Sequence, residues 1–365
     1  MRTVGVIGAS LLVTTCMGQV FVGLGVVPGA NASTANAISS DGSTVVGTSQ
    51  QFGGAAWRWT LSTGRVDLGA LPGGFLMEHA NDVSGDGSVI VGGMNDGVSV
   101  STAWRWTLGT GIQRVTGIGA GAFGPYVSSN GSTIVGRAEG TPLSAVRWTQ
   151  ATGVQSLNPV TGLPFGNGST TIAYGVSGDG SVVVGVGLGT SSNTPPTLSS
   201  VPFRWTQLTG SVGVLNNGQF FGAPAGVGAT DVSDDGAVMV GIGEAGVFRW
   251  NAVDGFQLLF NEAQPPGSGR PHVSGDGLTA VYGQRIWTQM GGLLSLNGVL
   301  TSAGCNFSGW SNLIATGVDC DGNTFCGFGT NPAGQTEAWY ATIPAPGVGT
   351  FALAALSVSA LRRRR

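Results

Sequence analysis

The sequence contains no lysine, so all 15 of its basic residues are arginines, and charged residues of both signs make up only 9% of the chain. Five of the arginines lie at the ends, at Arg2 and in the run from Arg362 to Arg365. Between the ends, 15 − 5 = 10 arginines face 18 acidic residues, a balance of −8. Nucleic-acid binding requires a basic surface, so this deficit argues against a nucleic-acid partner.

Residue types that commonly serve catalysis or metal binding are also scarce. The two histidines, His79 and His272, have no Cys or His partner at metal-ligand spacing, and we expect both to lie in loops. Residues 319–323 resemble half of a calcium loop, but the closing Glu is absent. We therefore predict no catalytic residues, no cofactor and no metal site.

The chain has four cysteines, and only three of them lie beyond the N-terminal leader described below: Cys305, Cys320 and Cys326. An exported protein can form disulfides, and an odd number of cysteines leaves one thiol unpaired. We expect Cys305 to pair with either Cys320 or Cys326, and the sequence does not decide between them.

At 365 residues, the chain exceeds the roughly 250–300 residues that one hydrophobic core usually serves, so it needs two domains or a repeat architecture. It holds 66 glycines and 41% hydrophobic residues. Few charges combined with frequent Gly, Ser, Thr and Val indicate short strands joined by tight turns.

One unit recurs along the chain: Ala-x-x-Val-Ser-x-Asp-Gly-Ser-x-Val-Val-Gly, a variable stretch, and then Ala-x-Arg-Trp-Thr. The turn residue of the first half occurs at Asp41, Asp86, Asn130, Asp179, Asp235, Asp276 and Asp321. The tryptophan of the second half occurs at Trp59, Trp106, Trp148, Trp205, Trp250, Trp287 and Trp339. The two halves alternate strictly, so we count seven repeats of about 45 residues.

Each repeat has the pattern of four strands. In the second repeat these cover residues 80–84, 88–92, 103–107 and 113–116, and Asp86-Gly87 supplies the tight turn of the first hairpin. Four strands in about 45 residues is the length of a propeller blade. The sequence therefore predicts an all-β, seven-bladed β-propeller of four-stranded blades over residues 19–343.

The two ends of this region complement each other. The segment 24–29 (LGVVPG) matches 68–73 (LGALPG), which ends the first repeat, whereas the last repeat stops after its third strand. We expect the N-terminal strand to complete the last blade and close the ring, which leaves no blade unmatched. An open β-solenoid, the alternative, has no need of such a pair.

The outermost residues have the composition of sorting signals. Residues 1–18 carry one charge, an apolar stretch and small residues, which is the pattern of a cleavable signal peptide; the alternative is a first core strand. Residues 344–365 contain Pro-Ala-Pro, an apolar run of 14 residues (348–361) and four arginines. Both signals place the body outside the cytoplasm.

Two resemblances follow from these motifs. The tail is similar to the PEP-CTERM sorting signal, with Pro-Ala-Pro in place of Pro-Glu-Pro, and this implies an exosortase-type processing enzyme in a Gram-negative bacterium. The alternative is a plain membrane anchor. The repeats resemble the HAF-repeat family of extracellular proteins, through VSGDG at 83–87 and AWRWT at 103–107. That resemblance implies the propeller fold and export, and it lends no activity.

The repeated residues have structural interpretations. Where the first Trp of Ala-Trp-Arg-Trp is absent, Val or Phe replaces it, so we expect these positions to pack between blades. The repeated arginines are expected to donate hydrogen bonds to turn Asp residues or backbone carbonyls; the alternative is a cluster for anionic sugars. This set is Arg58, Arg105, Arg147, Arg204, Arg249 and Arg285.

We therefore predict a structural or binding scaffold at the cell surface or in the extracellular matrix, with an extracellular polysaccharide or a surface protein as its partner. The alternative is a carbohydrate-binding or carbohydrate-active propeller with a funnel lined by unrepeated acids such as Glu244 or Glu262. Ser-x-Asp-Gly also resembles the Asp-box of sialidases, but its spacing is one residue short. Any ligand site is expected at the insertion loops 187–200, 215–228 and 261–271 together with the funnel at the axis.

Overall fold

The computed structural model describes most of the chain between residues 20 and 344. The described ranges are 20–50, 54–69, 78–95, 101–120, 124–140, 144–157, 160–161, 170–190, 198–214, 228–243, 245–261, 267 and 269–344. The predicted signal peptide, and the predicted tail beyond Pro344, lie outside these residues.

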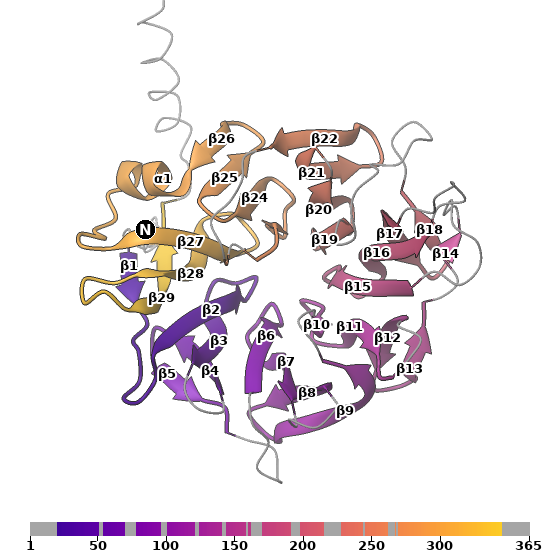
Figure 1. The fold of residues 1–365 in the computed structure, drawn as a ribbon, viewed down its shortest axis with the longest axis horizontal. Coiled ribbons are helices and arrows are strands. Elements are labelled where there is room, and N and C mark those ends of the chain that lie inside the picture. Colours follow the sequence, from indigo (N-terminus) through magenta and orange to yellow (C-terminus); the bar gives the residue numbers. More distant parts are fainter. Residues whose placement is uncertain are drawn as a thin grey trace, which may run out of the picture.

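Short antiparallel strands are grouped in sheets that radiate from a central axis (Figure 1). The first half of the chain forms β2 (Ala32–Ile38), β3 (Thr44–Gln50), β4 (Ala55–Thr60), β5 (Gly64–Asp67), β6 (Glu78–Val83), β7 (Val89–Asn95), β8 (Ser101–Thr107), β9 (Gly111–Gly119), β10 (Tyr126–Val127), β11 (Thr133–Ala138), β12 (Ala145–Thr149) and β13 (Gly153–Ser156).

The second half forms β14 (Val160–Thr161), β15 (Thr170–Val176), β16 (Val182–Thr190), β17 (Leu198–Thr206), β18 (Gly210–Gly213), β19 (Gly228–Val232), β20 (Val238–Gly243), β21 (Gly246–Asn251), β22 (Gly255–Phe260), β23 (His272–Val273), β24 (Thr279–Tyr282), β25 (Arg285–Thr288), β26 (Gly292–Ser295), β27 (Ser311–Val318), β28 (Thr324–Thr330) and β29 (Thr336–Thr342). The predicted all-β class is confirmed. The sequence analysis did not foresee the short helix α1 (Leu296–Ser302) or β14, which runs parallel to β18.

Five of the seven repeat turns are held by their own serine and aspartate. In the second repeat, Ser84 Oγ donates to Asp86 Oδ1 at 2.8 Å, and the same carboxylate oxygen accepts from the backbone N of Ser88. The backbone N of Val89 donates to Ser84 Oγ. Gly87 has φ = 71°, a conformation that favours glycine and that the predicted Asp-Gly turn requires. The Ser-x-Asp-Gly motif therefore encodes a self-contained hairpin turn.

Backbone hydrogen bonds of 2.8–3.0 Å link each turn to the next around the axis. They run from Asp41 N to Gly85 O, Gly85 N to Ser129 O, Asn130 N to Gly178 O, Gly178 N to Asp234 O, Asp234 N to Gly275 O, Asp276 N to Cys320 O, and Cys320 N to Ser40 O. The last bond joins the final repeat to the first, so the turns form an unbroken circle of hydrogen bonds.

A glycine in the second strand makes room for the aromatic residue opposite it. Gly47 pairs with Trp57, and a Cβ on Gly47 would lie 2.4 Å from the Trp57 ring. Gly92 and Trp104 repeat this arrangement, with 2.2 Å between the same groups. Trp57 and Trp104 are fully buried, which supports the predicted packing role. The final Gly of Val-Val-Gly is therefore a packing requirement.

The register corrects the alignment of the last two repeats. Trp339 pairs with Gly327, as Trp57 pairs with Gly47, so Trp339 is equivalent to Trp57 and not to Trp59. In the sixth repeat Tyr282 replaces the glycine and faces Arg285. Arg285 therefore stands at the position of the first Trp and does not belong to the repeated arginines, because the bulk of Tyr282 leaves no room for an indole ring opposite it.

The N-terminal strand β1 (Val20–Gly23) pairs antiparallel with β29, with Val20 opposite Thr342 and Gly23 opposite Trp339. The Phe21 ring lies 5.7 Å from that of Trp339, and Leu24 N donates to Ala338 O. Leu68 N donates to Ala56 O in the same way in the first repeat. The predicted pairing between the two ends of the repeat region is thus observed.

The insertion expected as a loop at 187–200 is partly strand, because β16 continues to Thr190 and β17 begins at Leu198, extending their hairpin. Most of the insertions at 215–228 and 261–271 lie outside the described residues. Within the described part of the chain, no helix is both long and apolar enough to cross a bilayer.

The buried indole of Trp104 gives a test of this packing. We expect Trp104→Ala to lower the free energy of unfolding by about 3–5 kcal/mol, because the cavity cannot refill. The control is Leu108→Ala, which removes a side chain that is 81% exposed and should change stability by less than about 0.5 kcal/mol. Chemical denaturation measures both; equal effects would contradict the packing.

Candidate functional site: the axial cavity

A cavity of about 100 Å³ lies on the axis, lined by the first strand of each repeat. The first strand of each repeat contains the Ala-x-x-Val part of the motif, in which the two x positions vary. In every repeat the second x residue lines the cavity. At this position stand Ala37, Asp82, Tyr126, Gly175, Asp231, His272 and Gly317. The cavity wall is thus built from the positions where the repeats differ.

Asp82 and Asp231 play equivalent roles in their repeats. Asp82 accepts hydrogen bonds from its neighbour Val83 N and from Val127 N of the next repeat, both at 2.8 Å. Asp231 accepts from Val232 N at 2.8 Å and from Val273 N of the next repeat at 3.0 Å. Each carboxylate thereby joins two neighbouring innermost strands.

The environment of the cavity changes the titration of Asp82. Its pKa is raised to about 6, mainly because the carboxyl group is removed from bulk water; the two backbone donors lower the pKa, and the nearby Asp231 adds to the rise. Asp82 is therefore a carboxyl group that changes protonation close to neutral pH.

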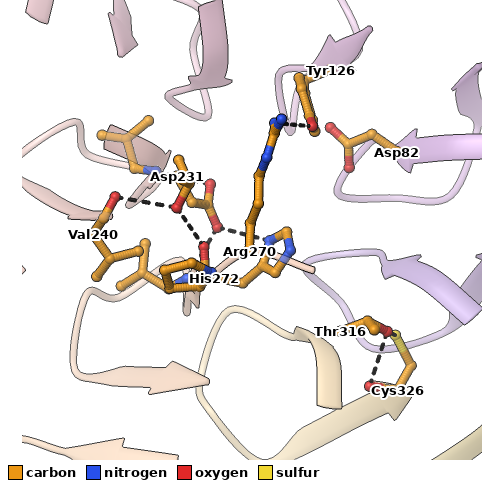
Figure 2. Close-up of polar contacts among 12 residues, drawn as sticks. Asp82, Tyr126, Asp231, Val240, Arg270, His272, Thr316 and Cys326 are labelled. Carbon is orange, nitrogen blue, oxygen red and sulfur yellow. Dashed lines mark hydrogen bonds and ion pairs between the residues drawn. The ribbon is translucent and has the colours of Figure 1, made fainter. Parts of the chain in front are cut away.

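His272 lies beside Asp231, with its Nδ1 3.4 Å from Asp231 Oδ2 (Figure 2). Their side chains are 26% and 24% exposed, so both are open to the cavity. The prediction that the histidines occupy loops is wrong, because His272 begins β23 and His79 lies in β6. Burial lowers the pKa of His79.

Arg270 contacts residues from two other repeats, and Figure 2 shows its contact with Tyr126. Its Nη1 donates to the Tyr126 hydroxyl at 2.8 Å, and its guanidinium carbon lies 3.8 Å from the centroid of the Tyr174 ring. Burial raises the pKa of both tyrosines, so both remain protonated near neutral pH. Arg270 is thus oriented by stacking on the Tyr174 ring and by a hydrogen bond to the Tyr126 hydroxyl.

The end of the cavity beside the repeat turns is closed by polar side chains. Ser40 Oγ and Ser129 Oγ lie 3.0 Å apart, and Ser129 Oγ in turn donates to Asp234 Oδ1. Burial, followed by the charge of Asp234, raises the pKa of the adjacent Cys320 thiol to about 11. These residues precede the turn residue in their repeats, so the floor of the cavity is another variable position.

The repeated arginines lie between successive sheets. The guanidinium carbons of Arg58, Arg147 and Arg249 lie 5.3–5.7 Å from the ring centroids of Trp106, Trp205 and Trp287 respectively, each in the next repeat. Arg204 Nη2 donates to Gly236 O of the next repeat. The observed contacts are thus backbone carbonyls and aromatic faces, distributed around the ring.

The other repeated residues are used within the fold. The six turn aspartates are exposed and accept hydrogen bonds from their own turns. Asn130 accepts equivalent bonds from Ser128 and Ser132. Among the second tryptophans, Trp59, Trp106 and Trp287 are buried, while Trp148, Trp205 and Trp250 are half-buried.

All three cysteines of the last repeat are free, which contradicts the expected disulfide. Cys305 contacts the backbone oxygens of Val20 and Thr342, and Cys326 lies beside Thr316. Asp319, in the suspected calcium loop, instead replaces the repeat serine and accepts from Asn323 N and Thr324 N. Among the described residues, no three potential metal ligands cluster together.

The axial funnel was expected to form part of any ligand site, but its residues were not predicted from the sequence. No unrepeated group of acids and histidines was expected, yet Asp82, Asp231 and His272 line one cavity, and Arg270 donates to Tyr126 in its wall. Glu244 and Glu262, named as funnel residues, lie outside the described residues. The sequence does carry a signal for these residues. When the repeats are aligned, the variable residue just before the Val of each first strand includes Asp82, Tyr126, Asp231 and His272.

The raised pKa of Asp82 predicts a loss of stability as pH rises. The folded form holds this proton up to about pH 6, whereas the unfolded chain releases it near 3.8, so stability should fall between those values. We expect Asp82→Asn to remove roughly 3 kcal/mol of this fall. Urea unfolding from pH 4 to 7.5 measures it. Asp319→Ser is the comparison variant, because the pKa of Asp319 is also raised to about 6 and this residue contributes to the same pH dependence. An unchanged profile in Asp82→Asn would contradict the assignment.

The free cysteines give a second test. In the folded protein Cys305 and Cys326 should react negligibly with a thiol reagent, because both are buried and burial raises the pKa of Cys326 to about 12. After denaturation without reductant, Cys305, Cys320 and Cys326 should all react. Detection of a single reactive thiol among them would instead indicate a disulfide.

No protein-family model matches the sequence, and no curated protein matches it. The β-propeller domain of the trilobed protease from Pyrococcus furiosus, described as having an open velcro topology, aligns with a TM-score of 0.54 and 10% identity over 85% of this chain and 95% of that domain. TolB from Acinetobacter baumannii gives a TM-score of 0.44 at 12% identity over 84% of this chain, which spans 65% of that protein. A TolB-like protein from Agrobacterium tumefaciens gives 0.42 at 14% identity, over 77% of this chain and 94% of that one. The likeness to the first of these supports the β-propeller fold.

Proposed function

We propose that the chain is an exported, seven-bladed β-propeller that acts as a binding scaffold, with its ligand site at the axial cavity. Seven repeat turns, the antiparallel groups of strands that follow them, and the β1–β29 pairing support this blade count and the four-stranded blade. The N-terminal leader pattern and the apolar tail support export, and the tail suggests processing by an exosortase-type enzyme.

The observation that carries the binding role is that repeated and unrepeated polar residues make different contacts. The repeated Ser, Asp and Arg side chains make contacts within the ring, whereas the unrepeated Asp82, Asp231 and His272 line one cavity. Arg270, also unrepeated, donates to Tyr126 in the cavity wall. Unrepeated polar groups that converge in a concave site are the usual mark of ligand binding.

The chemistry of the cavity favours a small, polyhydroxylated ligand. Two carboxylates can accept from hydroxyl groups, Arg270 can donate, and the Tyr126 and Tyr174 rings offer aromatic surface. The cavity, at about 100 Å³, is smaller than the roughly 300–1,000 Å³ of pockets for drug-sized ligands. It therefore suits one sugar unit or the end of an extracellular polysaccharide.

A carbohydrate-active propeller is the second candidate, because one carboxyl group with a raised pKa faces a second carboxylate. Such a pair can supply a general acid and a charged partner in glycoside hydrolysis. Asp82 and Asp231 would take these roles. Their backbone hydrogen bonds to the next strand already explain both residues structurally, so we favour binding without catalysis.

A glycan-array screen of the full chain, checked by thermal shift, tests the proposal. We expect a saccharide that raises the melting temperature of the parent and loses its effect in Arg270→Met. The matched control is Arg147→Met, at a repeated position away from the cavity, which should bind as the parent does. A blank array on well-folded protein would contradict the sugar-binding role. Hydrolysis abolished by Asp82→Asn would establish the second candidate.

A further inference from the structure

Large apolar side chains project from the outer hairpins of five repeats. They occupy the turn between the third and fourth strands, one or two residues after the repeated Trp-Thr or Trp-Asn step. Their exposed fractions are 65% for Leu61, 81% for Leu108, 95% for Leu208, 92% for Val253 and 95% for Met290. Single exposed apolar residues are common on proteins, but their recurrence in the same hairpin turn of five repeats is not explained by chance.

The strand register places these tips on one face of the ring. Thr60, at the end of β4, pairs with Thr44, which follows the first repeat turn. Thr107 pairs with Val89 and Thr288 with Thr279 in the same way. The outer hairpins therefore lie at the same end of their sheets as the Ser-x-Asp-Gly turns, on what we call the turn face.

The polar groups of these tips are largely satisfied within the hairpin. The hydroxyls of Thr60 and Thr63 lie 2.7 Å apart, and those of Thr206 and Thr209 lie 2.8 Å apart. Thr63 N and Thr209 N donate to the first threonine of each pair. A tip whose donors are internally bonded can enter a less polar medium at low cost.

The C-terminal tail leaves the ring from the same face. Thr342, the last residue of β29, pairs with Thr324, which follows the last repeat turn. Ile343 N donates to Asn323 O, and Pro344 is exposed. The apolar run begins four residues later at Val348. Four residues span at most about 14 Å, so an anchored tail must keep the turn face close to the bilayer.

We propose that the turn face rests on a lipid bilayer, with Leu61, Leu108, Leu208, Val253 and Met290 inserted in the interface around the anchored tail. This inference rests on the proposed export, and it applies while the tail is held in the membrane, before processing by an exosortase-type enzyme. A fluid bilayer fits better than a protein partner, because the apolar tips are spread over separate sheets and form no single patch. The closed floor of the axial cavity would then face the membrane.

The six turn aspartates are exposed on this face, so an uncharged bilayer is the appropriate probe. The experiment uses the full chain bound to phosphatidylcholine vesicles, with Cys16→Ser and Cys320→Ser as the labelling background. A polarity-sensitive fluorophore is placed at Leu208→Cys or Met290→Cys. The control is Ala333→Cys, an exposed site between β28 and β29 at the opposite end of the sheet.

We expect the tip labels, and not the Ala333 label, to shift to shorter wavelengths and to be quenched by lipids that carry a quencher about 5–10 Å below the surface. Vesicle flotation of the same samples reports anchoring separately. A chain that floats with unquenched tip labels would overturn the docking alone, while one that does not float would overturn anchoring and docking together. A tip-label shift without lipid that depends on protein concentration would show a second copy on this face, and would also overturn the proposal.

Discussion

The innermost strand of each sheet has one edge that faces the axis, and the backbone groups on that edge need partners. The circle of backbone hydrogen bonds from turn to turn satisfies them at one end of the axis. Further along the axis, side chains provide the partners. Asp82 and Asp231 accept hydrogen bonds from backbone N–H groups of the next repeat. Asn36 and Thr316 donate to backbone carbonyls of the next repeat. A ring cannot close without these contacts, because an unpaired buried amide costs as much as a lost hydrogen bond.

This constraint also shapes the cavity. Where a repeat supplies Gly175 or Gly317 at the axial position, space remains; where it supplies Asp82, Tyr126 or Asp231, the space is occupied by a polar group. The same carboxylates that join neighbouring strands therefore form the wall of the candidate site. Structure and binding therefore use the same oxygen atoms. The pKa of Asp82 is raised because its carboxyl group is withdrawn from bulk water, despite the two backbone hydrogen bonds that lower it.

The packing between sheets follows a second rule, in which a glycine lies opposite an indole or phenyl ring. The rule holds at Gly47 and Gly92, and it accounts for the departure in the sixth repeat, where Tyr282 and Arg285 take the two places. In this repeat both members of the Gly–Trp pair are replaced, the glycine by Tyr282 and the tryptophan by Arg285. The repeat is therefore aligned correctly only when its second and third strands are compared together with those of the other repeats.

The sequence by itself determined the strands, the repeat turns and the pairing of the chain ends, because hairpin geometry and alternation are local and the Ser-x-Asp-Gly motif carries its own hydrogen bonds. Only the tertiary structure decided which variable residues meet at the axis, since Arg270, Tyr126 and Tyr174 come from three repeats. It also decided the register of Trp339 and Arg285 and the free state of the cysteines. Those outcomes depend on distances across the ring, which spacing along the chain does not encode.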